Sequence, residues 1–386
     1  MANLWIDADP SGLVWTGLDC DDDLAILAAR ALEATGEVAV VGLSICGGNA
    51  PLLHTWPNAK TLLSLAEVPW NLTKGLGWRS MQPAWRSLRL LSGSISEEES
   101  SDAAGAILHA AASLPPQSLT VLCLGPASNL ALALRRGPWL AERLKGAVLM
   151  GGELTHRRLD LNFMTDRGAA REILESALPT ILVPIQTCAQ VAMTPRWLQG
   201  LQQCPDAAAR SILPKMWLQT WMMPRLVNPR VVGLPGRPTS PGLSQGFIPW
   251  DLIALLAASR PQLFTWESWA VELPSCPSEQ GEPCNGTMHS EPFRLTGTSR
   301  ADVALVPWLQ VAEDEVLEQI LELLCRVPGT SGASLQPGFL TQLLLATLAA
   351  FVALALGARG IVTVCRNAGT YTRRMNNHLT SRQKRA

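Results

Sequence analysis

The sequence predicts an α/β fold, with an open, largely parallel, Rossmann-like sheet that carries helices on both faces. Two observations predict it. Short apolar runs rich in Val, Ile and Leu recur along the chain, and polar residues, Gly or Pro bound each of them, as is typical of buried strands. Segments with helical periodicity separate most of these runs. Strands that alternate with helices form βαβ units, and the strands of such units are parallel.

The predicted elements follow one another from the N-terminus onward. The runs predicted to form strands are residues 4–6, 38–45, 119–124, 147–150, 180–185, 268–273 and 301–307. The segments predicted to form helices are residues 22–34, 56–65, 103–112, 128–135, 167–178 and 314–324. Residues 194–263 are mostly helical in pattern, but the Pro- and Gly-rich stretch 224–249 within them predicts a long loop, and loops of that length are often functional.

The composition excludes several classes of protein. Hydrophobic residues make up 47% of the chain and charged residues only 16%, so the chain is not intrinsically disordered. A net charge of −1 supplies no basic field, so we expect no nucleic-acid partner. None of the nine cysteines forms a C-x-x-C pair and most lie in apolar runs, so we expect reduced thiols packed as small hydrophobic side chains.

The C-terminal part lacks charge. No Asp, Glu, Lys or Arg lies between Arg326 and Arg359, and the uncharged residues 339–358 would form a helix of about 30 Å, the thickness of a bilayer core. A buried core helix is the alternative. We expect a catalytic domain at 1–326, a linker at 327–338, a transmembrane helix at 339–358 and a basic tail at 359–386. Because the N-terminus does not resemble a signal peptide, the expected localisation is a membrane, with a single-pass C-terminal anchor and a cytosolic catalytic domain.

Acidic residues are concentrated near the N-terminus. Six of the 32 acids fall between Asp7 and Asp23, directly after the first predicted strand and at the start of the first helix. Carboxylates at this density repel one another and favour a cation, and oxygen ligands without a His or Cys cluster suit Ca²⁺ or Mg²⁺. The alternative is a solvated acidic loop in which Asp21 or Asp22 caps the helix. Polar residues also follow other predicted strands, at 47–49, 126–129 and 151–152, and the carboxyl ends of parallel strands meet at one crevice.

Seven ordered motifs carry a family resemblance. They are Asp7-x-Asp9-Pro, Asp21-Asp22-x-x-Ala25, Gly48-Asn49 with Asn58-Ala59, GPASNLALAL at 125–134, VLMGG at 148–152, LDLNFMTD at 159–166 and Trp250-Asp251. Together they resemble the inosine-uridine preferring nucleoside hydrolase family over roughly residues 2–325. The resemblance implies a nucleoside hydrolase fold and a Ca²⁺-dependent enzyme that cleaves the N-glycosidic bond of a ribonucleoside into free base and ribose.

The resemblance also implies roles for individual residues. Asp9, Asp22, Asp251 and the main-chain carbonyl of Ser128 would bind Ca²⁺, which would also hold the ribose 2′ and 3′ hydroxyls and the attacking water. Asp9 would be the general base for that water. The ribose hydroxyls would be bound by Asp21, Asn49, Asp160 and Asn162.

The sequence departs from the family pattern at several places. The loop 10–20 is longer than usual, residue 160 is Asp where many members have Glu, and residues 155–158 lack a recognisable ribose-binding Asn. Trp250 stands where members that protonate the leaving base often carry His. It is either a packed indole or a platform that stacks on a purine, and the second interpretation favours purine nucleosides. His156 and His54 are candidate substitute acids, although a packed or surface histidine is the more common case.

Two other functions stay open at this stage. A haloacid-dehalogenase-like phosphohydrolase would use Asp7 as nucleophile, Asp9 as acid and Mg²⁺ as cofactor. A membrane-tethered pseudoenzyme would bind a sugar or nucleoside without turnover. The expected partners are a small-molecule nucleoside and a membrane, and a homo-oligomer is neither indicated nor excluded.

Overall fold

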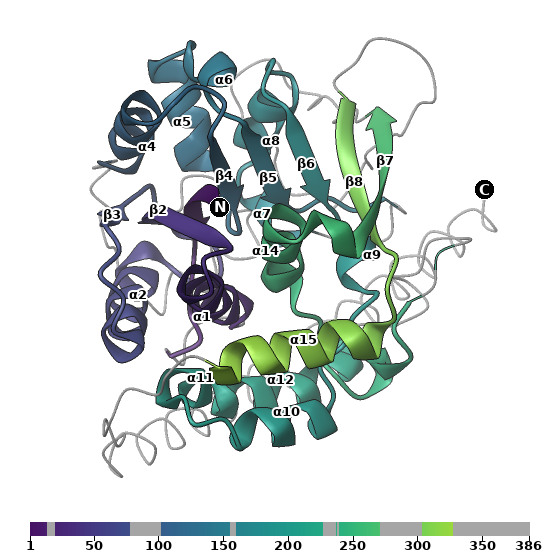
Figure 1. Ribbon diagram of the computed structural model, residues 1–386. Helices are drawn as coiled ribbons and strands as arrows, with labels where there is room; N and C mark the ends of the chain where they lie inside the picture. Colours follow the sequence, from purple (N-terminus) through teal and green to yellow (C-terminus); the bar gives the residue numbers. More distant parts are fainter. Residues whose placement is uncertain are drawn as a thin grey trace, which may run out of the picture. The chain divides into compact units, whose positions relative to one another are not determined.

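The computed structural model describes residues 1–13, 20–77, 102–154, 160–226, 237, 239–270 and 303–326, all of which belong to one compact unit, residues 1–334. Within these residues the structure is a mixed α/β fold with one sheet of eight strands (Figure 1). The strands are β1 (Ala2–Ala8), β2 (Val38–Ile45), β3 (Leu72–Lys74), β4 (Leu119–Cys123), β5 (Gly146–Met150), β6 (Thr180–Val183), β7 (Phe264–Ala270) and β8 (Val303–Leu309).

The sheet has the order β3-β2-β1-β4-β5-β6-β8-β7, and every pairing is parallel except that of β7 with β8. The strand order reverses between β1 and β4, because the chain proceeds outward from β1 to β3 and then returns to the other side of β1. Ligands of open α/β sheets bind beyond the carboxyl ends of the strands at such a reversal. The topology therefore places a binding crevice next to the ends of β1 and β4.

Helices connect the strands and cover the sheet. The longer ones are α1 (Asp21–Ala34), α2 (Leu52–Ala66), α4 (Asp102–Ser113), α5 (Ser128–Arg136), α8 (Arg167–Leu174), α10 (Pro195–Gln202), α12 (Leu213–Leu226), α14 (Trp250–Ser259) and α15 (Glu313–Arg326). The shorter ones are α6 (Leu140–Arg143), α7 (Leu161–Thr165), α9 (Ile185–Cys188), α11 (Ala207–Ser211) and the 3₁₀ turns η1 (Pro241–Ser244) and η2 (Pro261–Leu263).

Each face of the sheet has its own hydrophobic core. Strand side chains alternate between the two cores: Leu4 and Ile6 of β1 pack on one side with α1, α2 and α14, whereas Trp5 packs on the other side with α4, α5 and α8. Because both faces are covered, the central strands are mostly apolar and carry few charged residues, which accounts for part of the low charge of the chain. The prediction of a largely parallel sheet with helices on both faces is confirmed.

Two cysteines differ from the expectation. Cys204, which follows α10, and Cys325, in the last turn of α15, form a disulfide with a Cα–Cα distance of 4.9 Å. The expectation of reduced thiols is wrong for these two residues. Cys20, Cys46, Cys123 and Cys188 form no disulfide and are buried, as expected. The sequence separation of 121 between the bridged cysteines leaves no local pattern that could reveal the pair.

The expected membrane localisation is contradicted. Among the described residues no helix is long and apolar enough to cross a membrane. The longest, α2, has 15 residues and so spans about 22 Å, short of a bilayer core of roughly 30 Å. Residues 339–358, on which the expectation of a transmembrane helix rested, lie outside the described residues, as do the linker and the basic tail. The predicted domain boundaries stay predictions.

Candidate active site

The acidic residues that follow β1 lie at the carboxyl end of the sheet. Asp9 comes directly after β1, and Asp21 and Asp22 open α1. Asp251, some 230 residues later, is the second residue of α14. Each of these four side chains is at most 3% exposed. The fold therefore collects carboxylates from three chain segments at the carboxyl end of the sheet, beside the strand-order reversal.

Three of these carboxylates form a tight group. Asp21, Asp22 and Asp251 each offer an oxygen, and the three oxygens lie within 4.8 Å of one another. The main-chain N–H of Asp251 also donates a hydrogen bond of 3.4 Å to Oδ2 of Asp21. All three residues stand in the first turn of a helix, where the N-terminal partial positive charge favours carboxylates. Helix ends offset only part of the repulsion among three buried charges, and a hard cation would offset the rest, so the donor set fits Ca²⁺ or Mg²⁺.

Asp9 lies beside this group and is tied to it through the backbone. Its main-chain N–H donates a hydrogen bond of 2.9 Å to Oδ1 of Asp22, and its own carboxylate accepts a hydrogen bond from the main-chain N–H of Asn49. Gly48 and Gly125 line the two sides of the Asp9 carboxylate so closely that a Cβ atom at either position would overlap it. The two glycines are thus needed for close approach rather than for backbone freedom.

Asn49 joins two strand ends. The residue is half-buried in the loop after β2, and its Nδ2 donates a hydrogen bond of 2.9 Å to Oδ2 of Asp22. Asn49 thus holds both Asp9, through its main chain, and Asp22, through its side chain. A side chain that the resemblance assigns to ribose binding also orients a predicted metal ligand.

Asp160 and Asn162 lie beyond β5 and hold the local backbone. The Asp160 carboxylate caps α7, accepting hydrogen bonds from the main-chain N–H groups of Gly152 at 2.9 Å, Asn162 at 3.3 Å and Phe163 at 3.0 Å. Gly152 has φ +91°, a conformation that suits glycine. Nδ2 of Asn162 donates to the carbonyls of Leu124 and Met150, which follow or end β4 and β5. Both side chains therefore reach the predicted edge of the sheet while also stabilising it.

The remaining predicted residues have distinct surroundings. Ser128 is half-buried at the start of α5, and its hydroxyl donates a hydrogen bond of 2.6 Å to Asp166. Its hydroxyl thus has a structural role, which leaves the main-chain carbonyl as the predicted ligand.

Trp250 is half-buried, packs partly against the core and immediately precedes Asp251. His54 is half-buried on α2, and burial lowers its pKa. His156 lies outside the described residues.

Buried carboxyl groups near the site have raised pKa values. Desolvation raises the pKa of Asp7 to about 6, although hydrogen bonds from Ser44 and Asn129 lower it. Desolvation likewise raises the pKa of Asp160 to about 6, with its three backbone hydrogen bonds acting in the opposite direction. Asp7 is fully buried, and Ser44 and Asn129 donate to it at 2.6 and 2.8 Å. The Asp7 carboxylate thus ties β1 to Ser44 of β2 and Asn129 of α5, a structural role rather than the nucleophilic one that the phosphohydrolase alternative needs.

Asp23 has a role that the sequence did not reveal. Its Oδ2 accepts hydrogen bonds from the main-chain N–H groups of Ser11 at 3.1 Å and Gly12 at 2.7 Å, and its Oδ1 accepts one from Asn58 at 2.7 Å. Asp23 thereby fixes the loop after β1 against α1 and α2. The run Asp21-Asp22-Asp23 does not indicate that Asp23 binds the loop while Asp21 and Asp22 belong to the acidic group. Successive helical residues point about 100° apart, and only the surroundings decide which one meets the loop.

Comparison with known proteins agrees with this geometry. The inosine-uridine preferring nucleoside hydrolase family matches residues 4–315. An uncharacterized protein of Schizosaccharomyces pombe is 23% identical over 84% of this chain and 99% of its own length. Uridine nucleosidase 1 of Arabidopsis thaliana is 24% identical, covering 70% of this chain and 77% of its own.

Solved structures share the fold. A plant nucleoside hydrolase superimposes with a TM-score of 0.63 at 19% identity, covering 84% of this chain and 99% of its own. A purine-preferring ribonucleoside hydrolase from Gardnerella vaginalis superimposes with a TM-score of 0.64 at 18% identity, covering 84% and 98%.

Proposed function

Because the chain belongs to the inosine-uridine preferring nucleoside hydrolase family, and is therefore a hydrolase that acts on N-glycosyl compounds, we propose that it is a Ca²⁺-dependent ribonucleoside hydrolase with a preference for purine nucleosides. The observation that carries the proposal is the group of three buried carboxylates, Asp21, Asp22 and Asp251, within 4.8 Å of one another at the carboxyl end of the sheet. Such a group suits a hard cation.

The predicted ligands of the ion are Asp9, Asp22, Asp251 and the main-chain carbonyl of Ser128. The bound ion would supply a positive charge that orients the ribose hydroxyls and makes a neighbouring water easier to deprotonate. Asp21, whose carboxylate lies within the acidic group, would accept hydrogen bonds from the ribose hydroxyls together with Asn49, Asp160 and Asn162.

The chain's own residues account for the reaction as follows. Asp9 accepts a proton from the attacking water, whose oxygen forms a bond with C1′ of the ribose. The bond between C1′ and the base nitrogen breaks, and its electron pair stays on the leaving base, which then takes up a proton. The buried carboxylates stabilise the positive charge that develops on the ribose in the transition state.

The purine preference rests on Trp250. This half-buried indole belongs to the residue directly before Asp251, at the N-terminal end of α14. A flat aromatic side chain at that place can stack on a base, and a purine offers the larger surface. His156 and His54 remain candidates for the acid that protonates the base.

A hydrolysis assay tests the proposal. The purified full chain is incubated with inosine, guanosine or uridine, and ribose release is measured in Ca²⁺, after EDTA, and after Ca²⁺ is added back. We expect ribose from inosine and guanosine, loss of activity in EDTA and recovery with Ca²⁺. The control is Asp251→Asn, which keeps the shape of the side chain and removes one charge.

Each other result contradicts a defined part of the proposal. Ribose release that persists in EDTA would contradict the metal dependence. Faster ribose release from uridine than from inosine or guanosine would contradict the purine preference. Calorimetric binding of inosine without ribose release would identify a binding protein rather than an enzyme. Release of phosphate from p-nitrophenyl phosphate, with no ribose from any nucleoside, would identify a phosphohydrolase.

A further inference from the structure

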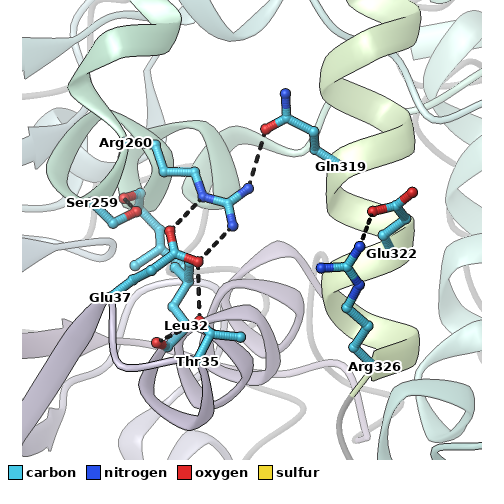
Figure 2. A network of polar contacts seen from close by, with 9 residues as sticks. Leu32, Thr35, Glu37, Ser259, Arg260, Gln319, Glu322 and Arg326 are labelled. Atoms are coloured by element: carbon cyan, nitrogen blue, oxygen red, sulfur yellow. Dashed lines mark hydrogen bonds and ion pairs between the residues drawn. The ribbon is translucent and has the colours of Figure 1, made fainter.

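The helices that carry the acidic group are joined a second time, at their opposite ends. α1 begins with Asp21 and Asp22, and α14 begins with Trp250 and Asp251. Arg260 is the residue that ends α14, and Glu37 follows α1 after a short turn. Nε and Nη2 of Arg260 donate hydrogen bonds of 2.8 Å each to the two carboxylate oxygens of Glu37 (Figure 2). α1 and α14 therefore run in the same direction between the acidic group and this ion pair.

The backbone holds both partners of the ion pair. The main-chain N–H of Arg260 donates to the carbonyl of Leu256 in α14 at 2.7 Å, and the main-chain N–H of Glu37 donates to the carbonyl of Leu32 in α1 at 2.9 Å. The hydroxyl of Thr35 donates a further hydrogen bond of 3.0 Å to Glu37. The main chains of both residues are thus held at the C-terminal ends of α14 and α1, and the Glu37–Arg260 ion pair connects those two ends.

A third helix supports the pair. Nη1 of Arg260 donates a hydrogen bond of 3.2 Å to Oε1 of Gln319 on α15, as Figure 2 shows. The side chains of Arg260 and Glu37 are 14% and 33% exposed, so solvent screens them less than it screens a fully exposed pair. A bidentate pair of this kind also fixes the angle between the two side-chain groups, because the planar guanidinium meets the carboxylate at two points.

The acidic group needs such a connection. Its carboxylates repel one another across the N-terminal ends of α1 and α14, so the charge that suits the site for a cation also drives the two helices apart. Both helices are rich in alanine, with Ala25, Ala28 and Ala29 in α1 and Ala254, Ala257 and Ala258 in α14. Small side chains of this kind let the axes of two packed helices approach closely.

We propose that Glu37 and Arg260 are a positioning pair for the acidic group. By fixing α1 against α14 at the far end, they set the distance of Asp21 and Asp22 from Asp251. The inference deepens the proposed function and rests on it, since the spacing of these carboxylates matters only if they hold the ion and the ribose. The pair touches neither substrate nor ion and acts entirely through the two helices.

The test measures Ca²⁺ binding as well as turnover. Isothermal titration calorimetry gives the Ca²⁺ affinity of the EDTA-treated, desalted full chain for the wild type, for Arg260→Gln and for the charge swap Glu37→Arg with Arg260→Glu. We expect Arg260→Gln to weaken Ca²⁺ binding about 10-fold, the lower end of what outer residues contribute to metal sites. The charge swap should recover most of that loss, because it restores the attraction between the helices.

The matched control is Glu322→Gln. Glu322 and Arg326 form an ion pair of 2.7 Å on the exposed face of α15, and this pair connects neither α1 nor α14 (Figure 2). The control should bind Ca²⁺ with wild-type affinity. If Arg260→Gln keeps wild-type Ca²⁺ affinity and wild-type kcat and KM, and only its melting temperature falls, the pair is merely structural and the inference is wrong.

The two proposals can fail separately. A wild-type chain that binds Ca²⁺ but releases no ribose, combined with weakened binding in Arg260→Gln, would refute the hydrolase and support the positioning pair. If the wild-type chain hydrolyses nucleosides and the Arg260→Gln variant behaves identically, the hydrolase is supported and the positioning pair is refuted. A wild-type chain that binds no Ca²⁺ would overturn the positioning pair together with the metal part of the proposed function.

Discussion

Nδ2 of Asn49 donates a hydrogen bond of 2.9 Å to Oδ2 of Asp22, across the gap between the loop after β2 and the first turn of α1. The main-chain N–H of the same residue binds the carboxylate of Asp9. Asn49 therefore supplies two N–H donors to a region that otherwise gathers negative charge. Its observed contribution is to stabilise and orient carboxylates, beside the substrate contact proposed for it.

Asn49→Asp should make the site more dependent on metal. The variant keeps the side-chain shape, removes the donor and adds a carboxylate next to Asp9 and Asp22, so like-charge repulsion destabilises the metal-free fold. We expect a melting temperature in EDTA lower than that of the wild type by at least about 1 °C, the shift that roughly 1 kcal/mol produces in a chain of this size. Saturating Ca²⁺ should recover most of the difference. Equal melting temperatures in EDTA would contradict the role assigned to Asn49.

Gly125→Ala should greatly lower activity with little unfolding. A Cβ at this position overlaps Oδ1 of Asp9, so the carboxylate must move, and a displacement of 1 Å in an active site can cost about 100-fold in rate. The control is Gly105→Ala, on the exposed side of α4, where a Cβ meets nothing within 4 Å. That variant should keep full activity and gain about 0.5–1 kcal/mol of unfolding free energy. Steady-state kinetics and urea unfolding measure both effects.

Trp250→Ala should change the choice of base. If the indole stacks on a purine, its removal costs about 1–3 kcal/mol of binding, and KM for inosine rises by at least about 5-fold. KM for uridine should change less, because a pyrimidine offers less surface for stacking. The comparison variant is Trp250→Phe, which keeps an aromatic ring. Its KM for inosine should lie between that of the wild type and that of Trp250→Ala. An equal rise of KM for both nucleosides would indicate a packing role alone.

Asp160→Asn should remove a pH dependence of stability. Burial raises the pKa of Asp160 from 3.8 to about 6, so the native state favours the protonated form. The stability that this provides is complete below pH 4, declines as the pH rises toward 6 and is absent above about pH 7. The difference in unfolding free energy, wild type minus variant, should fall by about 3 kcal/mol over that range. Urea titrations in EDTA at several pH values measure it, and a flat or rising difference would refute the raised pKa.

Removal of the disulfide should destabilise the chain without changing its chemistry. Cys204 and Cys325 close a loop of 121 residues, and bridges of this kind typically contribute about 2–4 kcal/mol. The double variant Cys204→Ser with Cys325→Ser should unfold at lower urea than the wild type and keep its kcat. The wild type in strong reductant should match the double variant. An oxidised wild type no more stable than the variant would show that the bridge contributes nothing.

Much of this molecule follows from local patterns in the sequence. Apolar runs bounded by Gly, Pro and polar residues predict β2 to the residue and the other central strands to within two residues, because buried parallel strands need continuous apolar surface. Placement at strand ends predicts that Asp9 and the loop of Asn49 converge, since parallel strands bring their carboxyl ends to one edge. The resemblance then joins Asp251 to them, and the structure places it beside Asp21 and Asp22.

Other features depended on the tertiary structure. The Cys204–Cys325 bridge, the contact of Glu37 with Arg260 across 223 residues and the hold of Asp23 on the loop after β1 leave no periodicity and no motif. The difference has a physical cause. The spacing of apolar residues in a strand or helix shows which side of that element is buried. This spacing can be read from residues that are close together in the sequence. Pairings between distant side chains depend on how whole elements pack, and only the folded chain fixes that.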